Sequence, residues 1–265
     1  MERIMLVSLD LEVTGEQVMM RARGAQHAAG TGNMTYRPFG NEKEVMYLPN
    51  SIVSAGACII ANINGTWEVI PRMFYRELKP ISSACTIEAM RIACLGLECR
   101  LAEDFLAPGD NPATFDPHSP HFHPELFLER MRTTSSTLAP EIAIPEFEDY
   151  IENASVDYGL PVLAASPIVF DGKFMDLYFA LFGTDRYHRH PLSKSPLGYG
   201  GIDIGSVLRG KANDMNVHLS WLGLRAKDGL THNSLEDAIQ QAEEFVVIAN
   251  PDPRTLNSML RSNTY

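Results

Sequence analysis

Near its start the chain carries an apolar run that leads into two acids, and it reads Ile4-Met5-Leu6-Val7-Ser8-Leu9-Asp10-Leu11-Glu12. The apolar part predicts a buried strand. Residues i and i+2 of a strand point to the same face, so Asp10 and Glu12 project together from its end. Two carboxylates this close repel each other unless a cation lies between them, and oxygen ligands suit hard divalent cations. The two acids are therefore candidate metal ligands, and the alternative is a solvated strand edge.

A second candidate segment lies towards the other end of the chain and reads Thr231-His232-Asn233-Ser234-Leu235-Glu236-Asp237-Ala238. Apolar residues then recur at helical spacing as far as Ala249, which predicts a helix. Ser234 and Asp237 resemble a capping box at its start. His232 precedes the helix and is able to titrate near neutrality, as a base for water must. Asp237, in the first turn, either binds a metal or interacts with the positive helix N-terminus.

A third candidate is an acid that follows a short apolar run. Val162 to Ala165 predict a buried strand, and the apolar residues from Phe170 to Leu181 then predict a helix with one apolar face. Asp171 falls at the start of that helix. On its own, this residue is best explained as an ordinary acid at a helix N-terminus.

These segments together resemble the DEDDh group of DnaQ-like 3′–5′ exonucleases. Asp10-Leu11-Glu12-Val13-Thr14-Gly15 is similar to the first motif of that family, Asp-x-Glu-x-Thr-Gly, and Phe170-Asp171 is similar to the second. The third motif, His-x-Ala-x-x-Asp, resembles residues 232–237, with Ser234 in place of Ala. Residues 201–206, Gly-Ile-Asp-Ile-Gly-Ser, resemble the strand-to-helix segment that the family places between its second and third motifs.

The sequence departs from the family pattern at two points. The family usually has an Asn shortly before the acid of the second motif, whereas Ser166 and Pro167 stand there in this chain. The gap between the first and second motifs is also longer than usual.

The resemblance implies an α/β, RNase H-like fold with a central mixed sheet, whose first three strands are antiparallel, and with helices on both faces. It implies a metal-dependent 3′–5′ exonuclease that releases nucleoside 5′-monophosphates. Two cations, Mg²⁺ or Mn²⁺, would be held by four acids, and the side chain of His232 would accept a proton from the attacking water. The implied metal ligands are Asp10, Glu12, Asp171 and Asp237, and the implied contacts to the terminal nucleotide are Leu11, Val13 and Thr14.

The chain supports this fold independently of the resemblance. Residues 52–62 and 66–78 predict a hairpin after the first strand, because Asn64-Gly65 is a strong turn signal between them. Helical patterns dominate from there on, with short apolar strands near residues 162–165 and 202–204.

The length of 265 residues fits one elaborated exonuclease domain, residues 1–265, with insertions at about 13–51 and 104–140. The first insertion begins at the candidate site, so it predicts either a flap over substrate or a disordered or oligomer-contacting loop. The second is rich in Pro, His and Phe and predicts a surface loop. Its His118, His121 and His123 are the residue type that binds transition metals, but the prolines disfavour a defined ligand spacing.

The composition is that of an ordinary globular protein, with 45% apolar and 21% charged residues. No apolar run reaches 18 residues, so no membrane-spanning helix is expected. The first motif lies close to the N-terminus, where a cleaved leader would remove it, and this favours a cytoplasmic location. The four cysteines show no Cys-x-x-Cys spacing, which favours reduced and mostly buried thiols.

A net charge of −11 argues against an extended groove for duplex backbone, which needs many Lys and Arg contacts. It is compatible with holding a short, single-stranded or frayed 3′ end of DNA or RNA. Related exonucleases are often dimers, so a homodimer is an open alternative. Two other functions also remain open, namely a catalytically silent nucleic-acid-binding or assembly module of the same fold and a hydrolase of a different nucleotide phosphoester.

Overall fold

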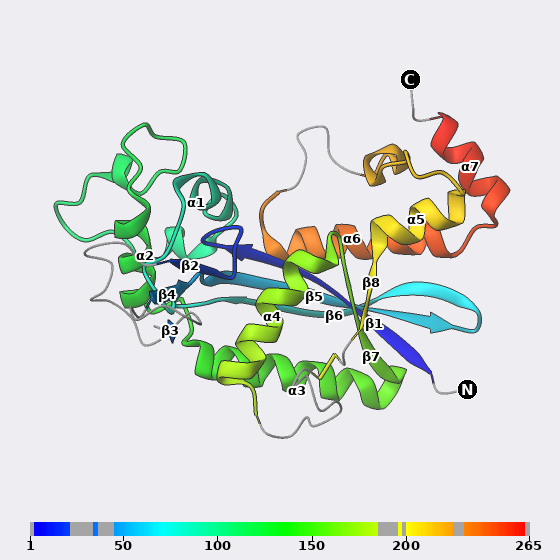
Figure 1. Ribbon diagram of the computed structural model, residues 1–265, viewed down its shortest axis with the longest axis horizontal. Coiled ribbons are helices and arrows are strands. Elements are labelled where there is room, and N and C mark those ends of the chain that lie inside the picture. Colours follow the sequence, from blue (N-terminus) through cyan, green and yellow to red (C-terminus); the bar gives the residue numbers. More distant parts are fainter. Residues whose placement is uncertain are drawn as a thin grey trace. The chain divides into compact units, whose positions relative to one another are not determined.

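A five-stranded mixed sheet forms the centre of the computed structural model, which describes residues 3–21, 34–36, 45–184, 196–197, 200–224 and 231–262 (Figure 1). The strand order is β6-β5-β1-β7-β8. The strands are β1 (Ile4–Val13), β5 (Ile52–Ile63), β6 (Thr66–Glu77), β7 (Leu160–Ala165) and β8 (Gly201–Asp203).

Strand β1 runs parallel to β7, with Ser8 opposite Ala164, and β7 runs parallel to β8. On its other side β1 neighbours β5, which the turn at Asn64-Gly65 joins directly to β6 as an antiparallel hairpin. Both turn residues have positive φ, 53° and 93°, the conformation that favours Asn and Gly in such turns. The predicted hairpin is therefore confirmed, and so are the predicted strands near residues 162–165 and 202–204.

The chain divides into two compact units. The first comprises Met1–Asp10, Gly56–Tyr75 and Ile144–Tyr265, and the second comprises Leu11–Ala55 and Arg76–Ala143. Both predicted insertions fall in the second unit. The single exonuclease domain stays a prediction.

Helices cover both faces of the sheet in the first unit (Figure 1). They are α3 (Pro140–Tyr158), α4 (Ile168–Phe182), α5 (Ile204–Ala212), α6 (Ser234–Ala249) and α7 (Pro253–Ser262), with a 3-10 turn, η4 (Leu219–Leu222). On one face, Leu6 of β1 and Ile60 of β5 share a core with Leu208 and Phe245 of α5 and α6. On the other, the ring of Phe74 on β6 lies 4.8 Å from that of Phe147 on α3.

The described residues of the second unit form a small antiparallel sheet and two short helices. The sheet has the order β2-β4-β3, formed by Met19–Arg21, Val45–Pro49 and Met34–Tyr36. The helical segments are α1 (Ile87–Ala93), η2 (Glu98–Leu101), η3 (Pro112–Thr114) and α2 (Pro124–Thr133). Most of the predicted 13–51 insertion, including its Gly-rich stretch at 30–33, lies outside the described residues.

The prediction of a surface loop at 104–140 is wrong. Phe105, Phe115, Phe122 and Phe127 from this segment are buried together in the core of the second unit, and α2 begins at Pro124. Pro suits the first position of a helix because its missing N–H would have no partner there. The phenylalanines follow no helical or strand period, so their shared burial was not readable from spacing.

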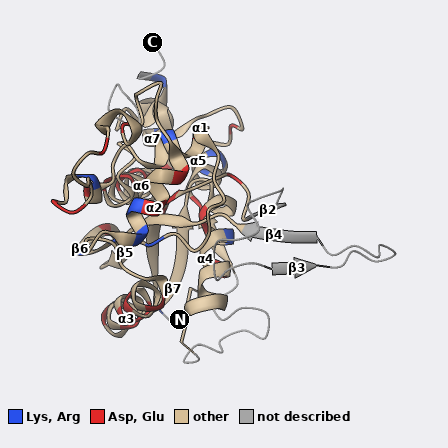
Figure 2. Cartoon of the chain, turned by 90° about the vertical axis from the view of Figure 1, so that its left-hand side faces the viewer, with Lys and Arg blue, Asp and Glu red and all other residues tan. Residues whose placement is uncertain are grey.

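Acidic residues are concentrated along α3, where Figure 2 colours them red. Its sequence contains six Asp and Glu and no Lys or Arg.

In the described part of the chain, no helix is both long and apolar enough to cross a membrane.

Candidate metal centre

Strand β1 carries the first two candidate ligands. Asp10 is partly buried and Glu12 is 8% exposed, both before the strand ends at Val13. The boundary between the two units falls within β1, after Asp10. The continuous strand itself therefore fixes Glu12 relative to Asp10, on the same face, as the alternation predicts.

Helix α6 begins at Ser234, and its N-cap is Asn233, whose side-chain oxygen accepts hydrogen bonds from the backbone N–H groups of Leu235 (3.1 Å) and Glu236 (3.3 Å). The prediction that Ser234 caps the helix is therefore wrong by one residue. Asn and Ser are nearly equal as caps, so residue type alone does not choose between adjacent candidates. The Ser234 hydroxyl is buried, with no hydrogen-bond partner among the described residues.

Asp237 organises the loop that enters α6. Its carboxylate is 1% exposed and accepts hydrogen bonds from the Thr231 backbone N–H (3.0 Å), the Thr231 hydroxyl (3.1 Å) and the His232 backbone N–H (2.9 Å). His232 has a φ of 58°, in the left-handed region that non-glycine residues seldom adopt. These bonds hold the backbone of the strained residue, so Asp237 fixes the position from which the imidazole extends.

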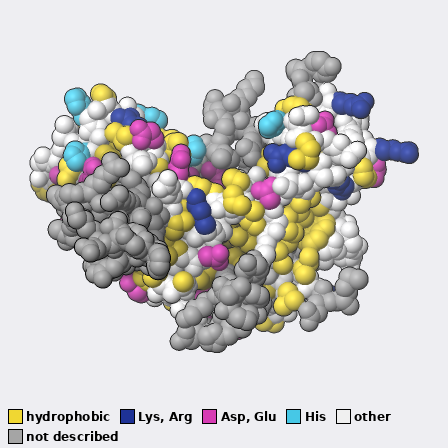
Figure 3. All heavy atoms as spheres, viewed as in Figure 1, with side chains coloured by type: hydrophobic (Ala, Val, Ile, Leu, Met, Phe, Trp, Pro, Cys, Tyr) yellow, Lys and Arg dark blue, Asp and Glu magenta, His cyan; other side chains and the backbone are white. Residues whose placement is uncertain are grey.

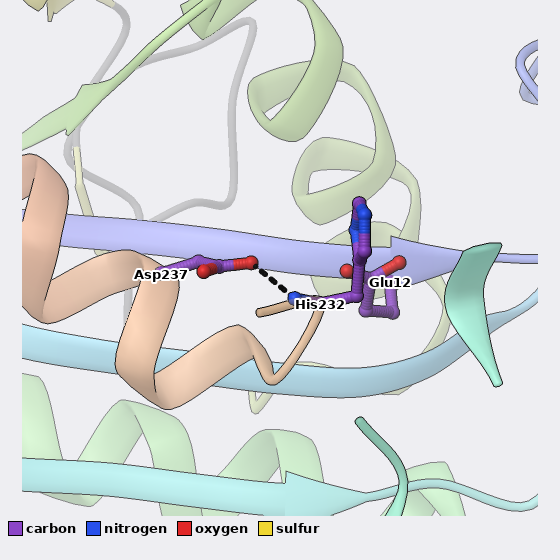
Figure 4. A group of neighbouring side chains, drawn as sticks. All are labelled: Glu12, His232 and Asp237. Carbon is purple, nitrogen blue, oxygen red and sulfur yellow. Dashed lines mark hydrogen bonds between the residues drawn. The ribbon is translucent and has the colours of Figure 1, made fainter. Parts of the chain in front are cut away.

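Glu12, His232 and Asp237 come together, as Figure 4 shows. One ligand atom from each lies within 4.8 Å of the other two. Two carboxylates and an imidazole are donor groups that bind divalent metals. Three residues predicted from opposite ends of the chain therefore meet at the end of β1.

Asp10 and Asp171 are not members of this group, as far as the described residues show. Asp10 accepts a hydrogen bond of 2.8 Å from the side-chain amide of Gln241, on α6. Asp171 is 3% exposed in the first turn of α4, as predicted. Helix α4 follows β7, the parallel neighbour of β1, so it starts at the same end of the sheet as Asp10.

The three residues predicted to contact a nucleotide are buried. Leu11 and Val13 are almost fully covered, and the hydroxyl of Thr14 donates to the carbonyl of Ala84 (2.7 Å) and accepts from the N–H of Ser51 (2.8 Å). In this structure the Thr14 side chain thus ties two other segments of its unit together. Its contact with substrate stays a prediction.

Three residues that sequence reasoning missed hold α6 against the sheet. The Ser8 hydroxyl donates to the Ala238 carbonyl (2.8 Å), and Gln241 reaches Asp10. A Cβ atom on Gly56 of β5 would lie 2.2 Å from the backbone nitrogen of Leu235, so only glycine permits this approach. A Ser inside an apolar run and a Gly inside a strand were available signals. Gln241 carried no such signal in the sequence, because only the folded structure shows that Asp10 is its partner.

Asp203 joins the starts of two helices. One carboxylate oxygen accepts from the N–H of Ser206, the other from that of Ile168. Burial acts to raise the pKa of Asp203, but these hydrogen bonds and the positive charge of Arg209 outweigh it and lower the pKa. The strand-to-helix segment expected at 201–206 is therefore present, with Asp203 as the N-cap of α5.

A separate cavity of about 310 Å³ lies beside α4 and β8. Leu163, Gly201 and Leu197 are among its lining residues, and Lys173 and Asp176 supply its charged groups. Burial raises the pKa of Asp176. Figure 3 shows hydrophobic side chains gathered over this part of the surface. None of the predicted site residues lines this cavity.

The four cysteines are free thiols, and Cys58, Cys94 and Cys99 are buried, as expected. Burial raises the pKa of Cys58 and of Cys85 to about 12, so both are neutral at physiological pH.

No protein-family model matches the chain, and no match was found among curated proteins. The function is therefore inferred from the chain's own residues.

Proposed function

We propose that this protein is a metal-dependent 3′–5′ exonuclease with an RNase H-like fold. The observation that carries the proposal is the convergence of Glu12, His232 and Asp237. Acids alone at a strand end are common, but two buried carboxylates and an imidazole from distant segments are not expected to meet without a reason.

The sheet supports the proposed fold. Strand β1 has the β5–β6 hairpin on one side and the parallel strands β7 and β8 on the other, with helices on both faces. This agrees with the expected α/β architecture of a mixed sheet with helices on both faces.

The donor set fits Mg²⁺ or Mn²⁺. Carboxylate oxygens are the ligands these cations prefer, and the chain places Glu12 and Asp237 in the group, with Asp10 and Asp171 towards the same end of the sheet. Asp237 uses three acceptor positions for the loop, and a carboxylate offers about four, so it retains capacity for a cation.

When bound, the cations would supply Lewis-acid polarisation of the phosphodiester and a more acidic water. The four acids would hold them. His232 would accept the proton of the attacking water at an imidazole nitrogen, and Asp237 would hold the backbone that carries this imidazole by accepting from the His232 N–H. Leu11, Val13 and Thr14, on either side of Glu12, would contact the terminal nucleotide.

The charge distribution favours a short single-stranded 3′ end as substrate. The net charge is −11, and the sequence of α3 contains six acids and no base, although Glu148 is buried and Asp157 is paired with Arg72. A long duplex would be repelled by such a surface, whereas one terminal nucleotide needs few contacts.

Oligonucleotides labelled at either end, incubated with Mn²⁺ or with EDTA, test the proposal. We expect early release of labelled mononucleotide from the 3′-labelled strand only, and none in EDTA. Glu12→Gln should lower the rate by about 10²-fold or more, because a metal ligand contributes several kcal/mol to the transition state. The matched control is Glu236→Gln, the same change at an exposed position next to Asp237.

Each other result identifies a rival function. Binding of the oligonucleotide without any hydrolysis in Mn²⁺ would indicate a catalytically silent module. Release from the 5′ end, or hydrolysis of free nucleotides alone, would indicate a hydrolase of a different phosphoester.

A further inference from the structure

Gln241 bridges the candidate ligand Asp10 and the turn that precedes α4. Its amide nitrogen donates to an oxygen of Asp10 (2.8 Å), and its amide oxygen accepts from the backbone N–H of Ser166 (2.9 Å). The side chain is 2% exposed. All three residues belong to the first unit.

The orientation of this amide is fixed by its partners. A backbone N–H is only a donor, so the oxygen of the amide must face Ser166 and the nitrogen must face Asp10. Rotating the amide would leave the Ser166 N–H without its acceptor and would turn the amide oxygen towards the Asp10 carboxylate, and both changes are unfavourable. Asp10 therefore meets a donor that is held in one direction.

We propose that Gln241 is a positioning residue that fixes the carboxylate of Asp10 for cation binding, an inference that rests on the proposed exonuclease function. A neutral amide suits this task, because a Lys or Arg in its place would neutralise the carboxylate and compete with the cation. The amide instead orients Asp10 and leaves its charge available.

The position of Gln241 on α6 couples two ligands. Gln241 follows Asp237 by four residues, so both side chains lie on the same face of the helix. The helix that contributes Asp237 to the group with Glu12 and His232 thus also sets the direction of Asp10. Placing α6 correctly on the sheet places both acids at once.

The adjacent residue provides a matched control. Gln240 is also on α6 and is partly buried, but its amide donates to Glu244 at 3.5 Å, away from the acids of the candidate site. Gln241→Met removes the donor to Asp10 with little change in volume, and Gln240→Met makes the same change one position earlier.

The test is Mn²⁺ binding to the full chain, followed by the electron paramagnetic resonance signal of free Mn²⁺, together with the melting temperature. We expect Gln241→Met to weaken Mn²⁺ binding by about 10–100-fold, the range for loss of a hydrogen bond to a metal ligand. Turnover should recover at saturating Mn²⁺. Gln240→Met should bind Mn²⁺ like the wild type. A purely structural role would lower the melting temperature of Gln241→Met and leave Mn²⁺ affinity unchanged.

Failure of this inference is distinguishable from failure of the proposed function. If the wild type binds Mn²⁺ and releases nucleotides while folded Gln241→Met keeps wild-type Mn²⁺ affinity, the positioning role is refuted and the exonuclease stands. If the wild type does neither, both are refuted. If Gln241→Met does not fold, Gln241→Asn replaces it in the same comparison of Mn²⁺ affinity and melting temperature. The Asn side chain is still an amide, but it is too short to reach both Asp10 and Ser166.

Discussion

Replacing His232 separates the chemistry of its side chain from the strain of its backbone. Its φ of 58° is left-handed, a conformation that glycine adopts freely and alanine does not. His232→Gly and His232→Ala both remove the imidazole, but only the glycine variant relieves the backbone. The two variants should therefore lose activity equally and differ in stability.

The magnitudes follow from these two causes. A left-handed non-glycine residue costs about 1–2 kcal/mol, so His232→Ala should be less stable than His232→Gly by about 1 kcal/mol after the greater chain entropy of glycine is subtracted. In a protein of this size that difference corresponds to about 2–4 °C in melting temperature. Loss of a positioned base should lower turnover by about 10²–10⁴-fold in both variants.

Single-turnover rates, melting temperatures and Mn²⁺ binding should be measured on the same preparations. Asn213 supplies the control, because it also has a positive φ of 55° and ends α5, without contact to the candidate ligands. Asn213→Gly and Asn213→Ala should show the same order of stability with unchanged turnover. A His232→Gly variant that turns over at close to the wild-type rate would remove the imidazole from the mechanism. Loss of Mn²⁺ binding in both His232 variants would make His232 a ligand rather than the base.

Three further outcomes are expected. Gly56→Ala should destabilise the fold by about 1–3 kcal/mol and reduce turnover, because the added Cβ would meet the backbone of α6 at Leu235. Urea unfolding and nucleotide release measure the two effects, and unchanged stability would show that α6 moves freely on the sheet. Single-stranded and frayed substrates should be degraded faster than blunt duplex, and faster blunt-end digestion in a gel assay would reveal a basic surface outside the described residues. The free energy of unfolding should fall as pH rises from about 9 towards 12, because burial raises the pKa of the Cys58 and Cys85 thiols to about 12, so they stay protonated while those of the unfolded chain ionise. Cys58→Ala should make this fall shallower in a pH series of urea unfolding, and an identical slope in the variant would contradict the assignment.

Local signals in the sequence predicted much of the fold. Asn64-Gly65 is a local turn signal, and it predicted the hairpin without knowledge of tertiary contacts. The spacing of apolar residues after Asp171 and after Asp237 predicted α4 and α6 in the same way. The core of the second unit was not predictable in this way, because its phenylalanines are joined by tertiary packing and have no periodic spacing.

The candidate site was predictable by residue type but not by contact. Glu12, His232 and Asp237 were identified from their motifs, and the structure brings them together. The bond from Gln241 to Asp10 links residues at opposite ends of the chain, and neither the helical pattern nor the strand pattern carries information about it.

The hydrogen bonds received by Asp237 hold Thr231 and His232, just before α6, through contacts made entirely within the protein. Little reorganisation would then accompany cation uptake, so exchange of Mg²⁺ for Mn²⁺ would be limited by the hydration shell of the ion rather than by refolding of the loop. The backbone amides of Thr231 and His232, although outside the helix, would exchange with solvent deuterium as slowly as amides within it, because a buried carboxylate accepts both.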